Sequence, residues 1–121
     1  MADITSKELA LAAAEALDEK KGGNISIIEI GDITTIADYF IIADGANAPQ
    51  VEALVDNVKE KLYKIGREPK RVEGVKNCGW VLLDYEDVVI HVFSKQDRLF
   101  YDLERVWKDG KNVSVEELRN Q

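Results

Sequence analysis

Helical periodicity marks the N-terminal segment of the chain. Apolar residues recur three to four positions apart behind the stretch T-S-K-E, in which Thr5 and Glu8 have the spacing of a capping box. Gly22 and Gly23 follow this segment, and glycine commonly stands just beyond a helix end. The pattern predicts a helix whose buried stripe consists of Leu9, Ala13, Ala16 and Leu17.

A second helical stripe begins after Gly45. Asn47 and Gln50 form a cap pair, and Pro49 stands in the first turn, where a missing backbone N–H costs nothing. Gly66 marks the end of this helix. Its predicted buried stripe consists of Val51, Leu54, Val55, Val58, Leu62 and Ile65.

Three short segments have the composition of strands. NISIIEI at 24–30 and YFIIAD at 39–44 are rich in β-branched residues and predict buried strands, joined by the connection GDITTIAD. PKRVEGV at 69–75 predicts a short edge strand, because its leading proline cannot donate a backbone hydrogen bond to a neighbouring strand.

The segment GWVLLDYEDVVIHVF at 79–93 predicts a hairpin with two different faces. We expect its turn at Tyr85-Glu86, and pairing across that turn sets Asp84 opposite Asp87. Because strand side chains alternate between faces, one face is purely aliphatic and consists of Val81, Leu83, Val88, Ile90 and Val92. The other, called the mixed face below, consists of Trp80, Leu82, Asp84, Asp87, Val89, His91 and Phe93.

A third helix follows the hairpin and ends at Asp109-Gly110. Its predicted buried stripe consists of Leu99, Phe100, Leu103, Val106 and Trp107. Residues 109–121 are interpreted as a C-terminal tail that is frayed apart from one short helix behind a capping motif at Ser114. The order of elements predicts one α/β domain over 1–108, in which helices flank a mixed five-stranded sheet.

Composition restricts the class of protein. At 121 residues, with 45% hydrophobic and 32% charged residues, the chain fits a single soluble globular domain. It has no apolar run of the roughly 20 residues that span a bilayer, and its first residues lack the basic leader of a secretory signal. A single cysteine, Cys78, fits a reducing compartment. We therefore expect a cytoplasmic protein without a membrane partner.

The net charge of −7 favours a basic protein over nucleic acid as the direct partner. Positive charge is concentrated locally at Lys59, Lys61, Lys64, Arg67, Lys70, Arg71 and Lys76. Glu60, Glu68 and Glu73 are interleaved with these residues. Such a run most often solvates a helix end and a loop, and the alternative is a minor RNA-facing edge.

The chain offers little for catalysis or for metal binding. One histidine and one cysteine form no zinc cluster, and no flanking base or elbow motif makes a nucleophilic pair of Cys78 and His91. A metal-dependent nucleotidyltransferase stays an alternative, although no glycine-serine loop is present to hold a triphosphate. Its acids would be Asp84 with Glu86, or the scattered Asp32, Asp38 and Asp44. We expect no catalytic residue, no metal and no cofactor.

The mixed face of the hairpin has three explanations. In the first, a helix of the same domain covers this face, and its acids only solvate the turn. In the second, Trp80 is an aromatic anchor surrounded by charged residues, as in a protein–protein hot spot. In the third, a plain dimerisation module buries this face against a second copy. His91 fits a partly buried sheet residue beside Trp80 better than a catalyst, which would need an oriented partner.

Four stretches resemble the ribosomal silencing factor family, also called Iojap-like proteins. They are ADYFIIADG at 37–45, RVEG at 71–74, GWVLLDYEDVVIHVF at 79–93 and FYDLERVW at 100–107. The resemblance runs in order from the first predicted helix through Trp107. It implies a nucleotidyltransferase-like fold without the transferase's catalytic residues, and a cytoplasmic, non-enzymatic translation repressor.

The resemblance also implies a partner. Such factors bind the large ribosomal subunit through its protein number fourteen, a basic intersubunit-face protein, and block joining of the small subunit when nutrients are scarce. Free members often form homodimers, and contact with ribosomal RNA is expected to be minor at most. The implied partner-binding surface consists of Trp80, Leu82, Asp84, Tyr85, Asp87 and His91.

The chain departs from the family pattern at three positions. Glu86 stands where glycine is common, which costs roughly 1 kcal/mol if its φ is positive. Asn47 replaces a frequent serine and keeps a helix cap. Pro49 stands where arginine is frequent, so a contact made by that arginine is not expected here.

Overall fold

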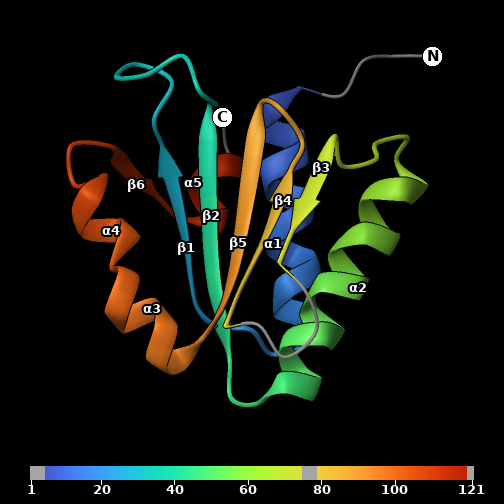
Figure 1. Ribbon diagram of the computed structural model, residues 1–121. Helices are drawn as coiled ribbons and strands as arrows, with labels where there is room; N and C mark the ends of the chain where they lie inside the picture. Colours follow the sequence, from blue (N-terminus) through green and yellow to red (C-terminus); the bar gives the residue numbers. More distant parts are fainter. Residues whose placement is uncertain (1–4, 75–78, 120–121) are drawn as a thin grey trace.

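A mixed β-sheet forms the centre of the molecule (Figure 1). The computed structural model describes residues 5–74 and 79–119, and in these residues the sheet has six strands. They are β1 (Gly23–Glu29), β2 (Tyr39–Gly45), β3 (Arg71–Glu73), β4 (Trp80–Asp84), β5 (Val88–Ser94) and β6 (Lys111–Val113). Their order across the sheet is β3-β4-β5-β2-β1-β6. The central pair β2 and β5 is parallel, and the other neighbours are antiparallel.

Helices lie on both faces of this sheet (Figure 1). The two long ones, α1 (Ser6–Glu19) and α2 (Ala48–Lys64), lie on one face. The short helices α3 (Lys95–Tyr101) and α4 (Leu103–Val106) lie on the other face, and α5 (Val115–Arg119) packs against α1. No helix among these residues is both long and apolar enough to cross a membrane.

The predicted caps begin both long helices. Thr5 Oγ1 accepts a hydrogen bond from the Glu8 N–H at 3.1 Å, and the Glu8 carboxylate reaches back to Thr5, which completes the capping box. Asn47 Oδ1 accepts from the Gln50 N–H at 2.9 Å, with Pro49 in the first turn of α2. Local sequence therefore determines where α1 and α2 start.

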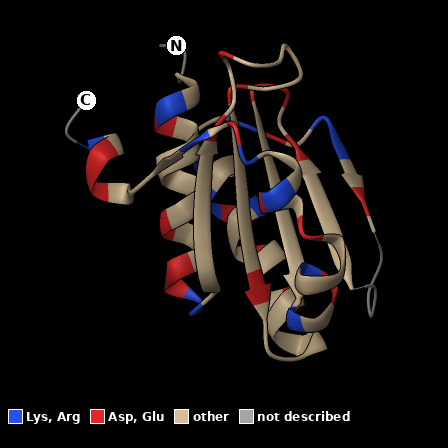
Figure 2. Ribbon diagram, turned by 90° about the vertical axis from the view of Figure 1, so that its left-hand side faces the viewer, with Lys and Arg blue, Asp and Glu red and all other residues tan. Residues whose placement is uncertain are grey.

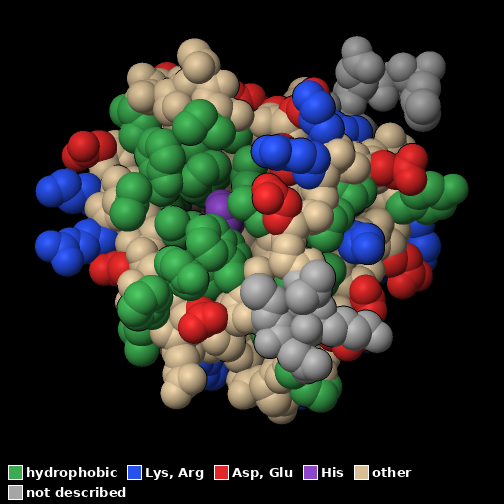
Figure 3. All heavy atoms as spheres, viewed as in Figure 1, with side chains coloured by type: hydrophobic (Ala, Val, Ile, Leu, Met, Phe, Trp, Pro, Cys, Tyr) green, Lys and Arg blue, Asp and Glu red, His purple; other side chains and the backbone are tan. Residues whose placement is uncertain are grey.

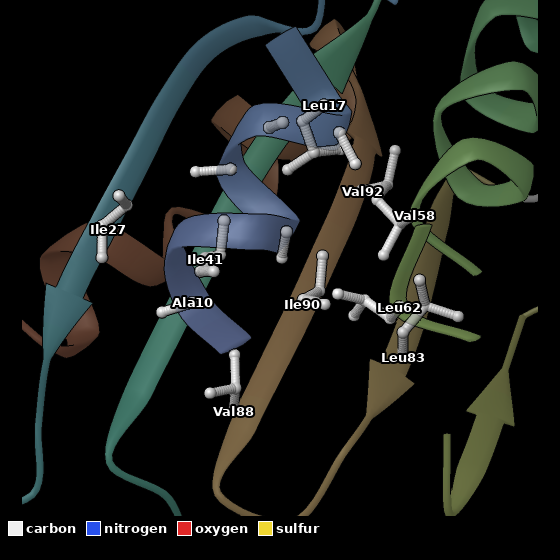
Figure 4. Packing of buried hydrophobic residues seen from close by; sticks show 14 of the residues in the cluster. Ala10, Leu17, Ile27, Ile41, Val58, Leu62, Leu83, Val88, Ile90 and Val92 are labelled. Atoms are coloured by element: carbon white, nitrogen blue, oxygen red, sulfur yellow. The ribbon is translucent and has the colours of Figure 1, made fainter. Parts of the chain in front are cut away.

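The main core lies between these two helices and one face of the sheet (Figure 4). The predicted stripes of α1 and α2 are buried there, apart from Ile65, which is 36% exposed. The aliphatic face of the hairpin is confirmed, because its five residues Val81, Leu83, Val88, Ile90 and Val92 all belong to this core. Alanines of α1 let the helix approach the strands closely, so that Ala10 lies over Ile41 in Figure 4.

The tail prediction and the expected strand number were wrong. Lys111–Val113 forms the sixth strand, in which Val113 pairs with Ile27 at the free edge of β1. The predicted capping motif at Ser114 is confirmed, because its Oγ accepts from the Glu117 N–H at 3.0 Å. Three residues are too few to show a strand period, so this pairing depends on the exposed edge of β1 rather than on local sequence.

The third helix is interrupted, and its predicted stripe is only partly buried. Asp102 adopts a left-handed conformation with φ 48°, which ends α3 and starts α4. Leu103 and Trp107 pack against the sheet, whereas Leu99, Phe100 and Val106 are 82%, 79% and 66% exposed. The break changes the direction of the chain, so a stripe read as one helix no longer faces one surface.

The burial of α5 leads to a stability prediction. Leu118 is 3% exposed and belongs to the main core, whereas Glu116 on the same helix is exposed. We expect Leu118→Ala to lower the free energy of unfolding by about 2 kcal/mol or more, because it leaves a cavity, and Glu116→Ala by less than about 0.5 kcal/mol. Urea denaturation of both variants measures the difference. Equal, small effects would mean that 109–121 is the frayed tail expected from the sequence.

Candidate functional site

The hairpin of β4 and β5 has a different turn from the one predicted. Trp80 pairs with Phe93 and Asp84 with Val89, so the two turn residues are Glu86 and Asp87. Asp84 and Asp87 are therefore not opposite each other. The shift moves no side chain of β4 or β5 to the other face of the sheet. In both registers, even-numbered residues of β4 pair with odd-numbered residues of β5.

Tyr85 explains the shift of the turn. In the observed register Tyr85 extends β4 by one position toward the core face, where its side chain is 1% exposed. Burial raises the pKa of Tyr85 to about 12. Glu86 takes the strained position of the turn with φ 74°, and its N–H donates to Asp84 Oδ1 at 2.8 Å. In this register the Tyr85 ring is buried, and Glu86 takes a left-handed conformation that costs about 1 kcal/mol.

His91 lies at the centre of the mixed face and is 3% exposed. Its Nδ1 accepts a hydrogen bond from Trp80 Nε1 at 3.1 Å, and its ring meets Phe40 edge-on at a centroid distance of 4.9 Å. This hydrogen bond assigns the proton of the neutral ring to Nε2, which has no partner among the described residues. Burial lowers the pKa of His91 to about 4. His91 is therefore a neutral residue that orients the Trp80 ring, as its predicted place beside Trp80 implies.

The acids at the hairpin tip are paired within the chain. Arg67 Nη2 lies 2.9 Å from Asp87 Oδ1, and the Arg67 guanidinium also donates to the Tyr85 carbonyl oxygen. Lys70 reaches Glu86 at 2.8 Å, and the hydrogen bond from Lys70 lowers the pKa of Glu86.

The third acid of the tip is paired in the same way, because Arg71 reaches Asp84 at 3.2 Å. The family resemblance implies that Asp84 and Asp87 belong to a surface for a basic ribosomal protein. The charges of the tip instead are largely compensated by the neighbouring basic span.

Other cations of the basic span also form ion pairs within the chain. Lys61 pairs with Glu19 and Lys64 with Glu60, in addition to the three cations at the hairpin tip. On the side of the molecule that Figure 2 shows, blue and red segments are interleaved. Lys76 and Cys78 lie outside the described residues. A compensated charge run of this kind favours the solvated surface over an RNA-facing edge.

Three of the five candidate metal ligands, Asp44, Asp84 and Glu86, are paired with cations of the chain. Asp44 is 3% exposed and accepts hydrogen bonds from Lys95 Nζ at 2.8 Å and Arg98 Nη1 at 3.0 Å. Asp84 and Glu86 hold Arg71 and Lys70, as described above. Within 5–74 and 79–119, no group of three His, Cys, Asp or Glu side chains is placed to hold a metal ion.

Arg98 fixes the α3–α4 segment to the sheet, a role that the sequence analysis missed. Its buried guanidinium donates to Asp44, to the Gly23 carbonyl oxygen, to Ser26 Oγ and to the carboxylate of Glu104. These bonds join α3, α4 and the ends of β1 and β2. The hydrogen bond from Arg98 also lowers the pKa of Glu104. An arginine beside an apolar stripe gave no signal of this role, because three of its acceptor residues, Gly23, Ser26 and Asp44, lie on strands far away in sequence.

The α3–α4 segment covers only part of the mixed face. Leu103 and Trp107 pack over Phe40 and the second, smaller core of this face, in which the Trp107 and Phe40 rings are 5.2 Å apart. Figure 3 shows hydrophobic side chains gathered around the single histidine on this side of the molecule. We call this the apolar surface and define it by half-buried Trp80 and Leu82 and by exposed Leu99, Phe100, Tyr101 and Val106.

The six residues predicted to bind a partner thus differ in their exposure and in their ion pairs. Trp80 and Leu82 are half-buried at the surface, and Asp84 and Asp87 hold internal ion pairs. Tyr85 and His91 are buried. The exposed Leu99, Phe100 and Val106 were missed as surface residues, although FYDLERVW and the leucine before it carry more apolar residues than one face of a helix can bury.

Burial of His91 predicts a dependence of stability on pH. Its pKa is about 4 in the folded protein and 6.5 in its ordinary state, so the unfolded chain binds the extra proton between these values. The contribution of neutral His91 to the free energy of unfolding is fully present above about pH 6.5 and falls as the pH drops toward 4. A glutamine at position 91 cannot titrate. We therefore expect the free energy of unfolding of His91→Gln to fall by up to about 3 kcal/mol less than that of the wild type when the pH drops from 6.5 to about 4.

Urea denaturation at several pH values measures this difference. The carboxylates titrate in both proteins, so they cancel in the comparison. Parallel pH profiles of the two proteins would show that His91 is not held neutral by the fold.

Comparisons with known proteins place this fold in a family. The family described as ribosomal silencing factor during starvation matches residues 3–121. The ribosomal silencing factor RsfS of Halalkalibacterium halodurans is 38% identical over 113 residues, which cover 93% of this chain and 97% of that protein. The ribosomal silencing factor RsfS of Bacillus subtilis is 35% identical over 118 residues, which cover 98% of this chain and 100% of that protein.

Solved structures agree with the sequence matches. A crystal structure of a Chromobacterium violaceum protein superposes with a TM-score of 0.84 at 34% identity and covers 92% of each chain. The family match includes both the mixed face and the segment 109–121 that forms β6 and α5. The chain therefore belongs to the ribosomal silencing factor family.

Proposed function

We propose that this protein represses translation by docking on the large ribosomal subunit through the apolar surface. The docked protein sterically prevents the small subunit from joining, and it acts when nutrients are scarce. Its contact on the large subunit is the ribosomal protein number fourteen, as expected from the family resemblance, and its site of action is the cytoplasm. No catalysis is needed for this role, because occupancy of the subunit surface alone blocks joining.

The exposure of large apolar side chains carries this proposal. Leu99, Phe100 and Val106 lie mostly in solvent on the α3–α4 segment. The Phe100 ring contacts the Tyr101 ring, which in turn lies 4.6 Å from the ring of Trp80. Contiguous apolar surface of this kind, rimmed by polar residues, marks protein-binding sites. The apolar surface includes a half-buried tryptophan and an exposed tyrosine, and these residue types are enriched among hot spots.

The remaining predicted site residues then have supporting roles. His91 orients Trp80 through the 3.1 Å hydrogen bond, and Tyr85 fixes the hairpin turn from the core. Asp84 and Asp87 hold Arg71 and Arg67, so they shape the tip of the hairpin rather than attract a basic partner with free charge. The binding energy in this proposal comes mainly from Trp80, Leu82 and the α3–α4 side chains.

A nucleotidyltransferase activity receives no support from the site. Asp84 and Glu86 would have to give up Arg71 and Lys70 before they could hold a magnesium ion. The nucleotidyltransferase-like character of the fold, which the resemblance implies, requires no such activity.

The free protein is proposed to form a homodimer through the same apolar surface. Exposed leucine and phenylalanine side chains gain free energy when a second copy covers them, by roughly 25 cal/mol per Å² of apolar area. Subunit docking and dimer formation then compete, because both need Phe100 and Trp80.

Subunit binding tests the docking proposal. We expect wild-type protein to sediment with isolated large subunits and to inhibit their joining with small subunits. Phe100→Ser should weaken binding by roughly 2 kcal/mol, about thirtyfold, because it removes an exposed aromatic contact. Tyr63→Ser, at a 67% exposed tyrosine on α2, is the matched control and should bind as the wild type does. Equal affinities of the two variants would contradict the assigned surface.

Sedimentation equilibrium of the free protein tests the dimer. We expect a concentration-dependent monomer–dimer equilibrium that Phe100→Ser shifts toward monomer and Tyr63→Ser leaves unchanged. A wild type that stays monomeric up to high concentration would refute the homodimer without affecting the docking proposal. A dimer that binds large subunits intact would refute the competition.

A further inference from the structure

A cleft opens at the edge of the apolar surface, between the end of β3, β4 and α3. Its volume is about 400 Å³, and it is lined by Glu73, Gly74, Trp80, Leu82, Asp97 and Tyr101. The Trp80 and Tyr101 rings have centroids 4.6 Å apart and form its aromatic part. Gly74 has φ 96° and approaches the Trp80 backbone so closely that a side chain would not fit there.

Two carboxylates flank these rings. Among the described residues, neither Glu73 nor Asp97 belongs to an ion pair, in contrast to the acids of the hairpin tip, which hold Arg67, Lys70 and Arg71. Glu73 is exposed at the end of β3, and Asp97 is half-buried in the first turn of α3.

Gly79 makes room for the second carboxylate. A Cβ atom at this position would overlap Asp97 Oδ2, so a larger residue would displace the carboxylate from its place at the cleft. Asp97 is also fixed through its backbone, because its N–H donates to Ser94 Oγ at 3.2 Å. Its carboxylate is therefore held next to the aromatic rings, and it has no cation partner among the described residues.

We propose that this cleft receives a lysine or arginine side chain of the protein partner that docks on the apolar surface. The proposal rests on the docking function and names the chemistry of one of its contacts. The aliphatic stem of such a side chain packs on Trp80 and Leu82, while its cationic head lies near the aromatic rings and the carboxylates of Glu73 and Asp97.

Physical chemistry favours this occupant over others. Tryptophan and tyrosine rings attract cations through their negative faces, and a carboxylate at the rim adds a charge-assisted hydrogen bond. A phosphate would be repelled by both carboxylates, which disfavours RNA at this place. A purely apolar side chain would desolvate the carboxylates without compensation. The charge that a basic partner recognises is thus in the cleft and not at the hairpin tip.

Neutralisation of the two carboxylates tests this inference. The variant Glu73→Gln/Asp97→Asn keeps the size of both side chains, and the control Asp56→Asn/Glu116→Gln makes the same change of net charge at exposed positions on α2 and α5. Affinity for isolated large subunits is measured at about 50 mM and about 200 mM NaCl. We expect the cleft variant to bind about tenfold more weakly at the lower salt concentration, with a flatter salt dependence, and the control to bind within about twofold of the wild type.

The outcomes separate this inference from the docking function. If the wild type binds no subunit, or if Phe100→Ser has no effect, the proposed function fails. If Phe100→Ser weakens binding but the cleft variant behaves as the control does, the cleft inference alone is overturned. Tighter binding of the cleft variant would indicate a neighbouring phosphate and would also overturn it.

Thermal melting verifies that each variant is folded. Glu73→Gln alone, at an exposed position on the edge strand, is used if the double variant is unstable. We expect this single variant to bind at least about threefold more weakly than the wild type. Unchanged affinity of a folded Glu73→Gln variant would overturn the inference.

Discussion

Burial of one face of the central strands under α1 and α2 is the constraint on which the rest of the structure depends. The aliphatic residues of β4 and β5, the Ala-rich stripe of α1 and the stripe of α2 form one continuous core. This core fixes which face of β4 and β5 points inward, because a shift by one residue would expose the whole aliphatic set. The opposite face is left with two short helices, and they are too small to cover it. The apolar surface is therefore a consequence of how the core is built.

Buried charge determines where those short helices lie. Arg98 connects Asp44 at the end of β2 with Glu104 on α4, and its remaining donors reach Ser26 and the Gly23 carbonyl oxygen. A buried ion pair of this kind adds little net stability, because desolvation offsets the attraction. Its hydrogen bonds nevertheless connect the segment to β1 and β2 in this placement. That placement puts Leu103 and Trp107 on the sheet and turns Leu99 and Phe100 outward.

The part of the fold that rests on local interactions was predictable from the sequence. Capping pairs at Thr5 and Asn47 and the apolar stripes behind them gave α1 and α2, and alternation gave both faces of the hairpin. Predictions failed where a distant partner decides the outcome. The strand at Lys111–Val113 forms only because β1 offers a free edge, and the turn moved to Glu86-Asp87 because the Tyr85 ring enters the core.

For the functional surface, the sequence by itself determined which chemical groups are present. They are a tryptophan and a histidine on the mixed face, an apolar-rich segment after the hairpin, and a net negative charge with one basic span. Only the tertiary structure decided which of these groups are available. It paired the acids of the hairpin tip with Arg67, Lys70 and Arg71, and it left Glu73 and Asp97 beside the aromatic cleft. The reason is that charge compensation and exposure depend on distances between side chains far apart in sequence, which a linear pattern does not contain.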